Sequence, residues 1–195
     1  MSDDAPRIRA WQQGNDEAGS AVVRALFPRV VRFFRGKVPD HEVQDLTQQT
    51  FVELTGSLPN VDPERDLAPW VFTIARRQLM RRHRHQQRHP EAPLLVSAAA
   101  PGATPSKVVR TREIKEILAD ALGRLSLDQR LCLELRYWEK LSIEGIAQVL
   151  EVNGSAAKMR LLRARQALRA QLEGLGLSAT LAVTTLAELT GSSDD

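Results

Sequence analysis

The sequence has very little cysteine and no apolar run long enough to cross a membrane. Its single cysteine, Cys132, excludes an intramolecular disulfide framework, and its leucine-rich surroundings predict a buried, unreactive thiol. No apolar run reaches the roughly 20 residues that a membrane-spanning helix needs, so we expect no membrane insertion. Asp3 and Asp4 are acidic and no long apolar stretch follows them, which predicts that there is no secretory signal. We therefore expect a cytoplasmic protein.

Signatures of enzyme chemistry are also lacking. There is no glycine-rich phosphate-binding loop and no recognisable pairing of a nucleophile with a base. His83, His85 and His89 form a short cluster, but no cysteine lies nearby and their spacing fits no standard zinc finger. For these histidines we favour weak phosphate contacts over metal binding. We predict no active site, no metal and no cofactor.

The positive charge is unevenly distributed along the chain. The net charge is only +3, but arginine supplies nearly all of the positive charge and is concentrated in residues 76–88 and 158–169. The planar guanidinium group can form two hydrogen bonds at once to a phosphate or a base edge, whereas a lysine ammonium is a point charge. The two arginine-rich segments therefore indicate a nucleic-acid partner.

Strand signals are nearly absent, and apolar residues recur at helical spacing throughout the chain. We therefore predict an all-α fold, with a helix cap at residues 14–16 and a kink at Pro28 in the helix that follows. The expected helices cover residues 7–13, 18–34, 40–54, 67–88, 112–123, 127–139, 143–150 and 155–172.

Residues 89–112 differ in composition from the segments around them. They contain four prolines and many small residues, which is typical of a flexible linker. This linker separates a first helical domain at 1–88 from a second one at 113–173. Residues 174–195 form a C-terminal extension that is apolar and nearly uncharged until its end, with room for one short helix at 178–189.

The helix that begins at Asp40 has two different faces. Carboxylates and amides on an exposed face suit a protein partner, although a merely solvated face is the simpler interpretation. The apolar face consists of Val43, Leu46, Thr50 and Leu54, and the polar face of Glu42, Asp45, Gln48 and Gln49.

The helix at 67–88 combines aromatic and basic side chains. Trp70 and Phe72 near its start offer stacking surface, and Trp70 is equally compatible with a core position. The arginines that follow have no acid among them, which suits the gripping of a nucleic-acid strand. They are Arg76, Arg77, Arg81, Arg82, Arg84 and Arg88, and positions 77, 81, 84 and 88 form a single stripe at helical spacing.

Residues 142–169 have the proportions of a helix-turn-helix, in which the second helix enters the major groove of DNA. An ordinary hairpin with a solvated basic face remains the alternative. Arg165 and Arg169, nearer the core edge, fit phosphate contacts better than base contacts. The second helix has a core stripe of Ala157, Leu161, Ala164, Leu168 and Leu172, opposite which lie Ser155, Met159 and Arg163, with Lys158 and Arg160 beside them.

Several segments, taken in order, resemble the extracytoplasmic-function (group IV) sigma factors of the sigma-70 family. The resemblance covers residues 14–88 and 113–172, through FPRVVRFF, DLTQQTF and DPERDLAPWVFTIARR in the first half and LGRLSLDQRLCLELRYWEKLSIEGIAQVL in the second. The family usually has Gln-Glu-Thr-Phe where this chain has an amide at Gln49, which removes one carboxylate from the expected polymerase contact. The residues after Gly174 lie outside the common pattern.

The resemblance implies a promoter-specificity subunit with core RNA polymerase, promoter DNA and, in many relatives, an anti-sigma factor as partners. It assigns polymerase binding to Asp45, Gln48 and Gln49. Recognition and melting of the −10 element fall to Asn60, Asp62, Arg65, Trp70, Arg76, Arg77, Arg81 and Arg84. Duplex recognition of the −35 element falls to Ser155, Lys158, Met159, Arg160 and Arg163.

Two other functions fit parts of the sequence. A stand-alone helix-turn-helix regulator would bind duplex DNA as a symmetric dimer on palindromic sites, but it leaves the helix at 67–88 without a role. A helical scaffold would meet acidic proteins through its arginines. Only a sigma factor predicts promoter-dependent initiation when the chain is added to core polymerase.

Overall fold

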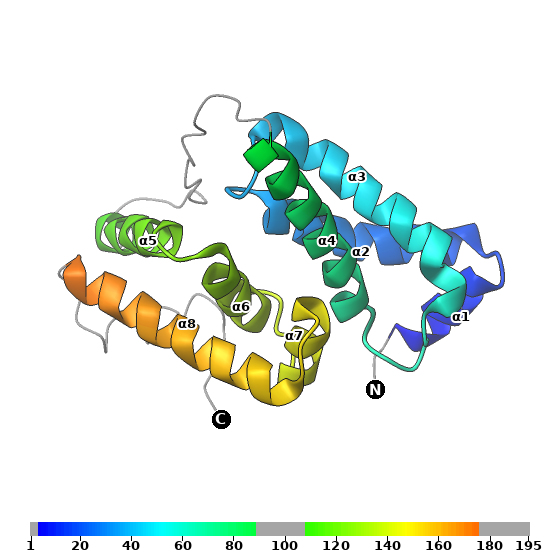
Figure 1. Cartoon of the computed structure of the whole chain (residues 1–195). Helices are drawn as coiled ribbons and strands as arrows, with labels where there is room; N and C mark the ends of the chain where they lie inside the picture. The colour runs from blue at the N-terminus through cyan, green and yellow to red at the C-terminus, as the bar shows by residue number, and fades with distance from the viewer. Residues whose placement is uncertain (1–3, 89–107, 176–195) are drawn as a thin grey trace. The chain divides into compact units, whose positions relative to one another are not determined.

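The computed structural model describes residues 4–88 and 108–175, and it divides the chain into two compact helical units (Figure 1). Apart from an isolated bridge between Arg35 and Val38, the regular structure of these residues is helical, which confirms the predicted all-α class. No helix in the described ranges is both long and apolar enough to cross a bilayer.

The first unit contains the helices α1 to α4. Their bounds are Ala5–Gln12 for α1, Asp16–Phe34 for α2, Asp40–Ser57 for α3 and Leu67–Arg88 for α4, with a short 3-10 turn, η1, at Leu58–Asn60. Helix α2 packs against the other three, and α3 packs along α4 (Figure 1). The interior is formed by fully buried side chains that include Ile8, Val30, Phe34, Leu54, Val71, Phe72 and Leu79.

The start of α2 follows the expected capping chemistry. The side chain of Asn15 accepts a hydrogen bond from the Ala18 backbone N–H at 2.9 Å, and Gly14 before it has a φ of +89°. A left-handed backbone of this kind favours glycine, so α1 and α2 are joined by a tight turn. Helix α2 continues through Pro28 to Phe34.

The second unit is built mainly from α5 to α8. Helix α5 spans Val108–Gly123, α6 spans Leu127–Tyr137, α7 spans Ile143–Leu150 and α8 spans Gly154–Gly174. Helix α8 packs against α5 and α6. The predicted core stripe of α8 is confirmed, because Ala157, Leu161, Ala164, Leu168 and Leu172 are all buried.

Local hydrogen bonds fix the beginnings of three helices in this unit. Ser126 and Gln129 form a capping box at the start of α6. The Ser142 hydroxyl accepts from the Gly145 N–H at 3.0 Å, and the Asn153 side chain accepts from the Ala156 N–H at 2.8 Å. These caps satisfy N–H groups that have no partner inside a helix.

Several expected helix boundaries differ from the structure by one to three residues, and the start of α5 differs by four. Helix α5 begins at Val108, within the segment expected to be linker, and α8 begins at Gly154. The left-handed residue of the turn between α7 and α8 is Glu151, with a φ of 55°. The rest of the expected linker, residues 89–107, and the expected helix at 178–189 lie outside the described residues.

Candidate functional site

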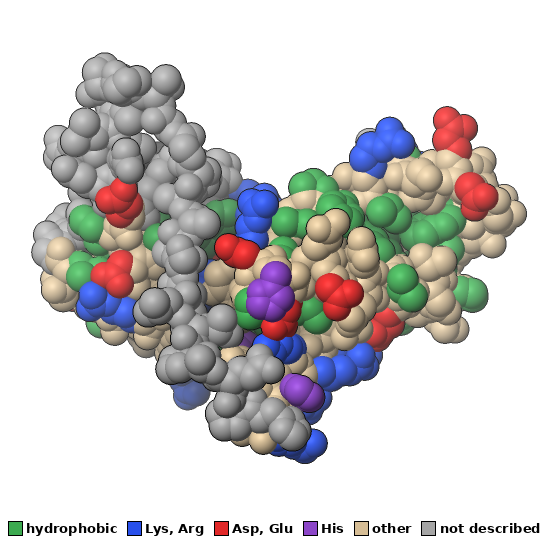
Figure 2. Space-filling model, turned by 90° about the horizontal axis from the view of Figure 1, so that it is seen from above, with side chains coloured by type: hydrophobic (Ala, Val, Ile, Leu, Met, Phe, Trp, Pro, Cys, Tyr) green, Lys and Arg blue, Asp and Glu red, His purple; other side chains and the backbone are tan. Residues whose placement is uncertain are grey.

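The outer face of α3 presents the polar side chains that the sequence singled out. Asp45, Gln48 and Gln49 are exposed, and the Gln49 amide donates to the Asp45 carboxylate at 2.7 Å. Val52, on the same face one turn further, is 74% exposed. Figure 2 views the molecule from the side on which α3 lies, and acidic and apolar side chains are interspersed there. Val52 is absent from the residues that the sequence analysis assigns to this face, although its helical spacing from Asp45 and Gln48 places it there.

Glu42 does not belong to that face, contrary to the sequence-based expectation. Its side chain is only 21% exposed, and Arg82 of α4 binds it with both Nε and Nη2, the latter at 2.6 Å. The hydrogen bond from Arg82 holds the pKa of Glu42 below its ordinary value of 4.5, and the charges of Arg82, His41 and His85 act in the same direction. Glu42 and Arg82 therefore connect α3 to α4.

The arginine stripe of α4 is exposed as predicted. Arg77, Arg81, Arg84 and Arg88 are all exposed, whereas the Arg76 side chain is only 15% exposed. Although α4 itself carries no acid, α3 brings one close, because Glu53 lies 3.5 Å from Arg81 and accepts a hydrogen bond from Gln78 at 2.8 Å. At this distance Arg81 keeps its guanidinium group largely free for another anion, because exposed pairs are weak.

The two aromatic residues at the start of α4 have different environments. Trp70 is half-buried, and its indole N–H donates to the Ser57 hydroxyl at 3.2 Å. Phe72 is fully buried, with its ring 5.5 Å from that of Phe33. The suggestion that Phe72 offers a stacking surface is therefore wrong, because its position on the helix turns it into the core.

The loop between α3 and α4 exposes the polar residues expected to meet a base. Asn60, Asp62 and Arg65 are exposed. The Asp62 carboxylate accepts from the Glu64 N–H at 3.0 Å and lies 3.4 Å from Arg65 Nε. The Asp66 side chain accepts from the Ala68 N–H at 3.0 Å and so caps α4. The loop thus offers amide, carboxylate and guanidinium groups within a few residues.

Helix α1 holds this loop in place, which the sequence did not reveal. The Gln12 side-chain amide donates to the backbone carbonyls of Leu58 at 3.0 Å and Val61 at 2.7 Å. Leu58 and Val61 are themselves buried, and Arg9 forms an ion pair with Glu64. The exposed loop residues therefore stand on a backbone that is anchored on both sides of Asn60.

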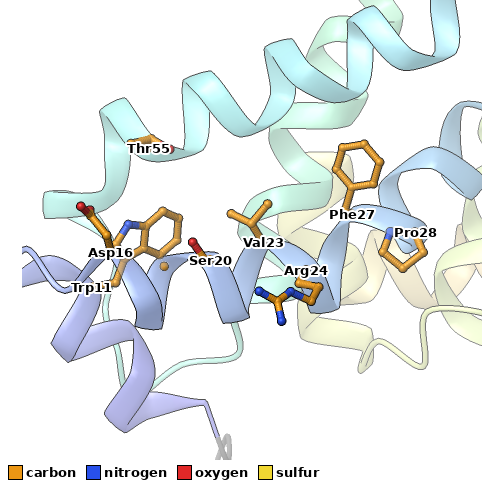
Figure 3. Close-up of a pocket in the computed structure, with 9 residues that line it drawn as sticks. Trp11, Asp16, Ser20, Val23, Arg24, Phe27, Pro28 and Thr55 are labelled. Atoms are coloured by element: carbon orange, nitrogen blue, oxygen red, sulfur yellow. The ribbon is translucent and has the colours of Figure 1, made fainter.

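A pocket of about 610 Å³ lies in the first unit, where α1, α2 and α3 meet (Figure 3). Trp11 from α1 and Val23 and Phe27 from α2 give it apolar walls, and Thr55 lies on the α3 side. The indole of Trp11 covers Gly19 so closely that a Cβ atom at this position would collide with it. The pocket therefore depends on glycine at that point of α2.

The outer face of α8 is basic with an apolar centre. Ser155, Lys158 and Arg163 are exposed and Arg160 is half-buried, while Met159 is 48% exposed and Leu162 is 46% exposed. Arg165 lies over the ring of the buried Tyr137, 5.5 Å from its centroid, and Arg169 pairs with Glu173 at 3.1 Å. Leu162 belongs to this face as well, although the sequence analysis does not assign it there.

The histidines of α4 differ in their surroundings. His85 is exposed, whereas His83 is half-buried, and burial lowers the pKa of His83. His89, the third member of the cluster, lies outside the described residues. Within the described ranges, no three His, Cys, Asp or Glu side chains are grouped so that they could hold a metal ion.

Comparison with known proteins gives the same family for both halves of the chain. The family model for sigma-70 region 2 matches residues 22–89, and that for sigma-70 region 4 matches residues 115–168. RNA polymerase sigma factor CarQ of Myxococcus xanthus is 30% identical over 171 residues, which cover 87% of this chain and 98% of CarQ. ECF RNA polymerase sigma factor SigW of Bacillus subtilis is 24% identical over 182 residues, which cover 87% of this chain and 96% of SigW.

Solved structures show the same fold. CnrH, solved in complex with the cytosolic domain of CnrY, has a TM-score of 0.65 at 24% identity, over 88% of this chain and 97% of that one. The sigma factor RpoE of Bartonella quintana, solved with the anti-sigma factor NepR, has a TM-score of 0.66 at 22% identity, over 79% of this chain and 96% of the RpoE chain. The region 2 match also gives the first unit a role that a stand-alone helix-turn-helix regulator would lack. The chain belongs to the extracytoplasmic-function sigma factors of the sigma-70 family, and it is an RNA polymerase sigma factor.

Proposed function

We propose that this sigma factor divides promoter recognition among three surfaces. The outer face of α3 binds core RNA polymerase, α4 and the loop before it hold the opened −10 element, and α8 reads the −35 element as duplex DNA. The polymerase-binding surface consists of Asp45, Gln48, Gln49 and Val52. The −10 surface consists of Asn60, Asp62, Arg65, Trp70, Arg76, Arg77, Arg81 and Arg84. The −35 surface consists of Ser155, Lys158, Met159, Arg160 and Arg163.

The observation that carries this proposal is the exposed arginine stripe on α4 beside a loop of exposed polar side chains. Pulling a base out of the stack costs a few kcal/mol, which contacts to the extruded base and its strand must offset. Exposed guanidinium groups at Arg77, Arg81 and Arg84 can contact successive phosphates. Asn60 and Asp62 can hydrogen-bond to a base edge, and their backbone is already anchored by Gln12.

The face of α3 suits a protein partner better than DNA. Its carboxylate would repel a phosphate backbone, whereas the carboxylate and the two amides can pair with basic or amide groups around an apolar contact at the exposed valine. Because the Glu42–Arg82 pair ties α3 to α4, the polymerase-binding face and the DNA-binding stripe belong to one packed unit. Docking on the polymerase would therefore also position α4.

In this proposal the two domains, residues 1–88 and 113–173, act together only when polymerase carries them. The chain works in the cytoplasm and contributes specificity, while catalysis stays with the polymerase. An anti-sigma factor is a further proposed partner, supported by the related fold of RpoE, which was solved with the anti-sigma factor NepR bound. The role of residues 174–195 in such regulation is testable by deletion.

Promoter-dependent transcription with purified core polymerase tests the proposal directly. We expect run-off transcripts from genomic promoters only when the chain is added, with thymines near the start site becoming reactive to permanganate. The variant Arg77→Glu/Arg81→Glu should leave polymerase binding intact and abolish the permanganate-reactive bubble. A bubble of unchanged intensity in this variant would refute the role of α4, and failure of the chain to bind polymerase would refute the whole proposal.

A further inference from the structure

Two large apolar side chains lie exposed on the outer face of α8. Met159 and Leu162 are 48% and 46% exposed, and their spacing of three residues makes them neighbours on the helix surface. The core face of α8 is the opposite stripe, which packs on α5 and α6, so this face is not required for folding of the unit. Two adjacent apolar side chains that lie outside the core offer a small contact surface, and the groups around them decide what it can contact.

The surroundings of this strip decide which kind of partner fits it. Ser155 and Arg163 share its face and Lys158 lies beside it, all three exposed. Helix α8 carries no acidic residue before Glu173. A strip bordered only by cations and hydroxyl or amide groups is matched by a polyanion that also offers an apolar group. In duplex DNA that apolar group is the C5-methyl of thymine, which projects into the major groove.

We propose that Met159 reads a thymine methyl group in the −35 element, with Leu162 extending the apolar contact. The inference rests on the proposed binding of α8 to duplex DNA. Met159 lies in the N-terminal half of α8, which is the half that a helix-turn-helix places against base edges. A thioether makes no strong hydrogen bond, so it distinguishes bases by apolar contact, and its flexible chain can adapt to the position of a methyl group.

The chemistry predicts a specific form of selectivity. At the base pair under Met159, thymine is preferred because it carries a methyl group, and uracil, which pairs identically but lacks that methyl, binds less well. Burying one methyl group changes affinity by about fourfold. Arg163 and Lys158, in contrast, contact phosphates or hydrogen-bonding edges and are indifferent to the methyl group.

The test compares thymine with uracil in otherwise identical promoters. In the first step, core polymerase carrying the full-length chain is mixed with a pool of DNA duplexes that share a fixed start region and have a randomised upstream sequence. The duplexes that bind are recovered. Each thymine of the upstream part of the selected duplex is then replaced singly by deoxyuridine. We expect one or two positions at which the wild-type holoenzyme binds the deoxyuridine duplex about fourfold more weakly.

Two variants of Met159 link the effect to this side chain. In Met159→Ala and in Met159→Gln, which keeps the length but ends in an amide, the thymine-to-uracil ratio should fall to near one. Gln166→Ala, also exposed on this side of α8, should retain the ratio. Arg163→Ala should weaken binding to both duplexes equally and reduce its salt dependence.

The outcomes separate this inference from the proposed function. Suppose that Arg163→Ala weakens DNA binding but the thymine-to-uracil affinity ratio of the wild type is one. Then α8 binds DNA and the proposed methyl contact is wrong. The same conclusion follows if the wild-type ratio differs from one but is unchanged in both Met159 variants. If Arg163→Ala has no effect and the upstream segment is not protected, the proposed binding of α8 to DNA fails as well. Unchanged DNA binding by Met159→Gln together with loss of a bound regulator would make the strip a protein-docking surface and would overturn the inference.

Discussion

Glu42 and Asp45 lie one turn apart on α3, yet their carboxylates have different surroundings. The Asp45 carboxylate is exposed and accepts a hydrogen bond from the neighbouring Gln49 amide on the same helix. Glu42 is largely covered and receives two N–H groups from Arg82 across the helix pair. Residues of the same charge on the same helix thus serve different ends, one open to a partner and one joining two helices.

Because Glu42 pairs with Arg82, we expect the free energy of unfolding to differ between the wild type and a Glu42 variant by an amount that depends on pH. The folded pKa of Glu42 is depressed, so its contribution is present above the ordinary value of 4.5 and is lost as the pH falls through the lower folded value. Glu42→Gln should lower the free energy of unfolding by about 1–2 kcal/mol at pH 7, because it breaks a partly buried charged pair. Urea unfolding at several pH values measures this.

The matched control is Asp45→Asn, an exposed carboxylate on the same helix, which should change the unfolding free energy by less than about 0.5 kcal/mol. The difference between wild type and Glu42→Gln should shrink as the pH is lowered below 4.5. A difference that stays constant down to strongly acidic pH would show that the charge of Glu42 does not stabilise the fold.

Gly19 gives a second prediction at the scale of one residue. Alanine is normally favoured over glycine inside a helix by about 0.5–1 kcal/mol. At Gly19 a Cβ would collide with the Trp11 indole, so Gly19→Ala should instead destabilise the protein by about 1–3 kcal/mol. Thermal unfolding of Gly56→Ala, a helical position where a Cβ meets nothing within 4 Å, provides the comparison.

The prediction for Gly19 has a direct check in a double variant. Trp11→Ala removes the side chain that the new methyl would meet, so the combined variant should be less destabilised than the sum of the single ones. If Gly19→Ala raised the melting temperature as Gly56→Ala is expected to do, the indole would have to move aside freely, and the close packing would not constrain α2.

At the scale of elements, the loop between α3 and α4 depends on α1. The Gln12 amide bonds the carbonyls of Leu58 and Val61, which flank Asn60. Without these bonds the loop would keep its buried anchors but lose a fixed backbone between them. We therefore regard Gln12 as a positioning residue for the proposed −10 contacts rather than as a DNA contact.

The variant Gln12→Ala should reduce open-complex formation by about fivefold to thirtyfold, which corresponds to the loss of one to two hydrogen bonds of about 1 kcal/mol. Polymerase affinity should be unchanged, because α3 is not altered. Permanganate reactivity and a polymerase pull-down measure the two quantities separately. Gln13→Ala, at the adjacent exposed position, should affect neither. Equal losses in both assays would indicate general unfolding instead of loop positioning.

For the whole molecule, the proposal requires that polymerase binding and promoter opening be separable. Asp45→Arg should weaken binding to core polymerase by about tenfold or more, since it places a like charge against a basic partner. Asp45→Asn should have a smaller effect. Affinity measured by titration of labelled chain with core polymerase checks this, and an affinity unchanged by charge reversal would remove α3 from the interface.

The sequence alone was sufficient for features that depend on neighbours along the chain. The core stripe of α8, the cap at Asn15 and the exposed arginine stripe of α4 follow from helical spacing and local hydrogen bonding, which every helix imposes in the same way. The family was also readable, because the motifs of two domains occur in the right order.

Only the tertiary structure determined which side chains of different helices contact one another. That Glu42 faces Arg82, that Gln12 holds the loop after α3, that Phe72 is buried and that Trp11 covers Gly19 depends on how α1 to α4 pack. These contacts join residues far apart in sequence, and a helical pattern specifies which face is buried without specifying which side chain it meets. Spacing within one helix is set by the backbone, whereas pairing between helices is set by the packing of the whole core.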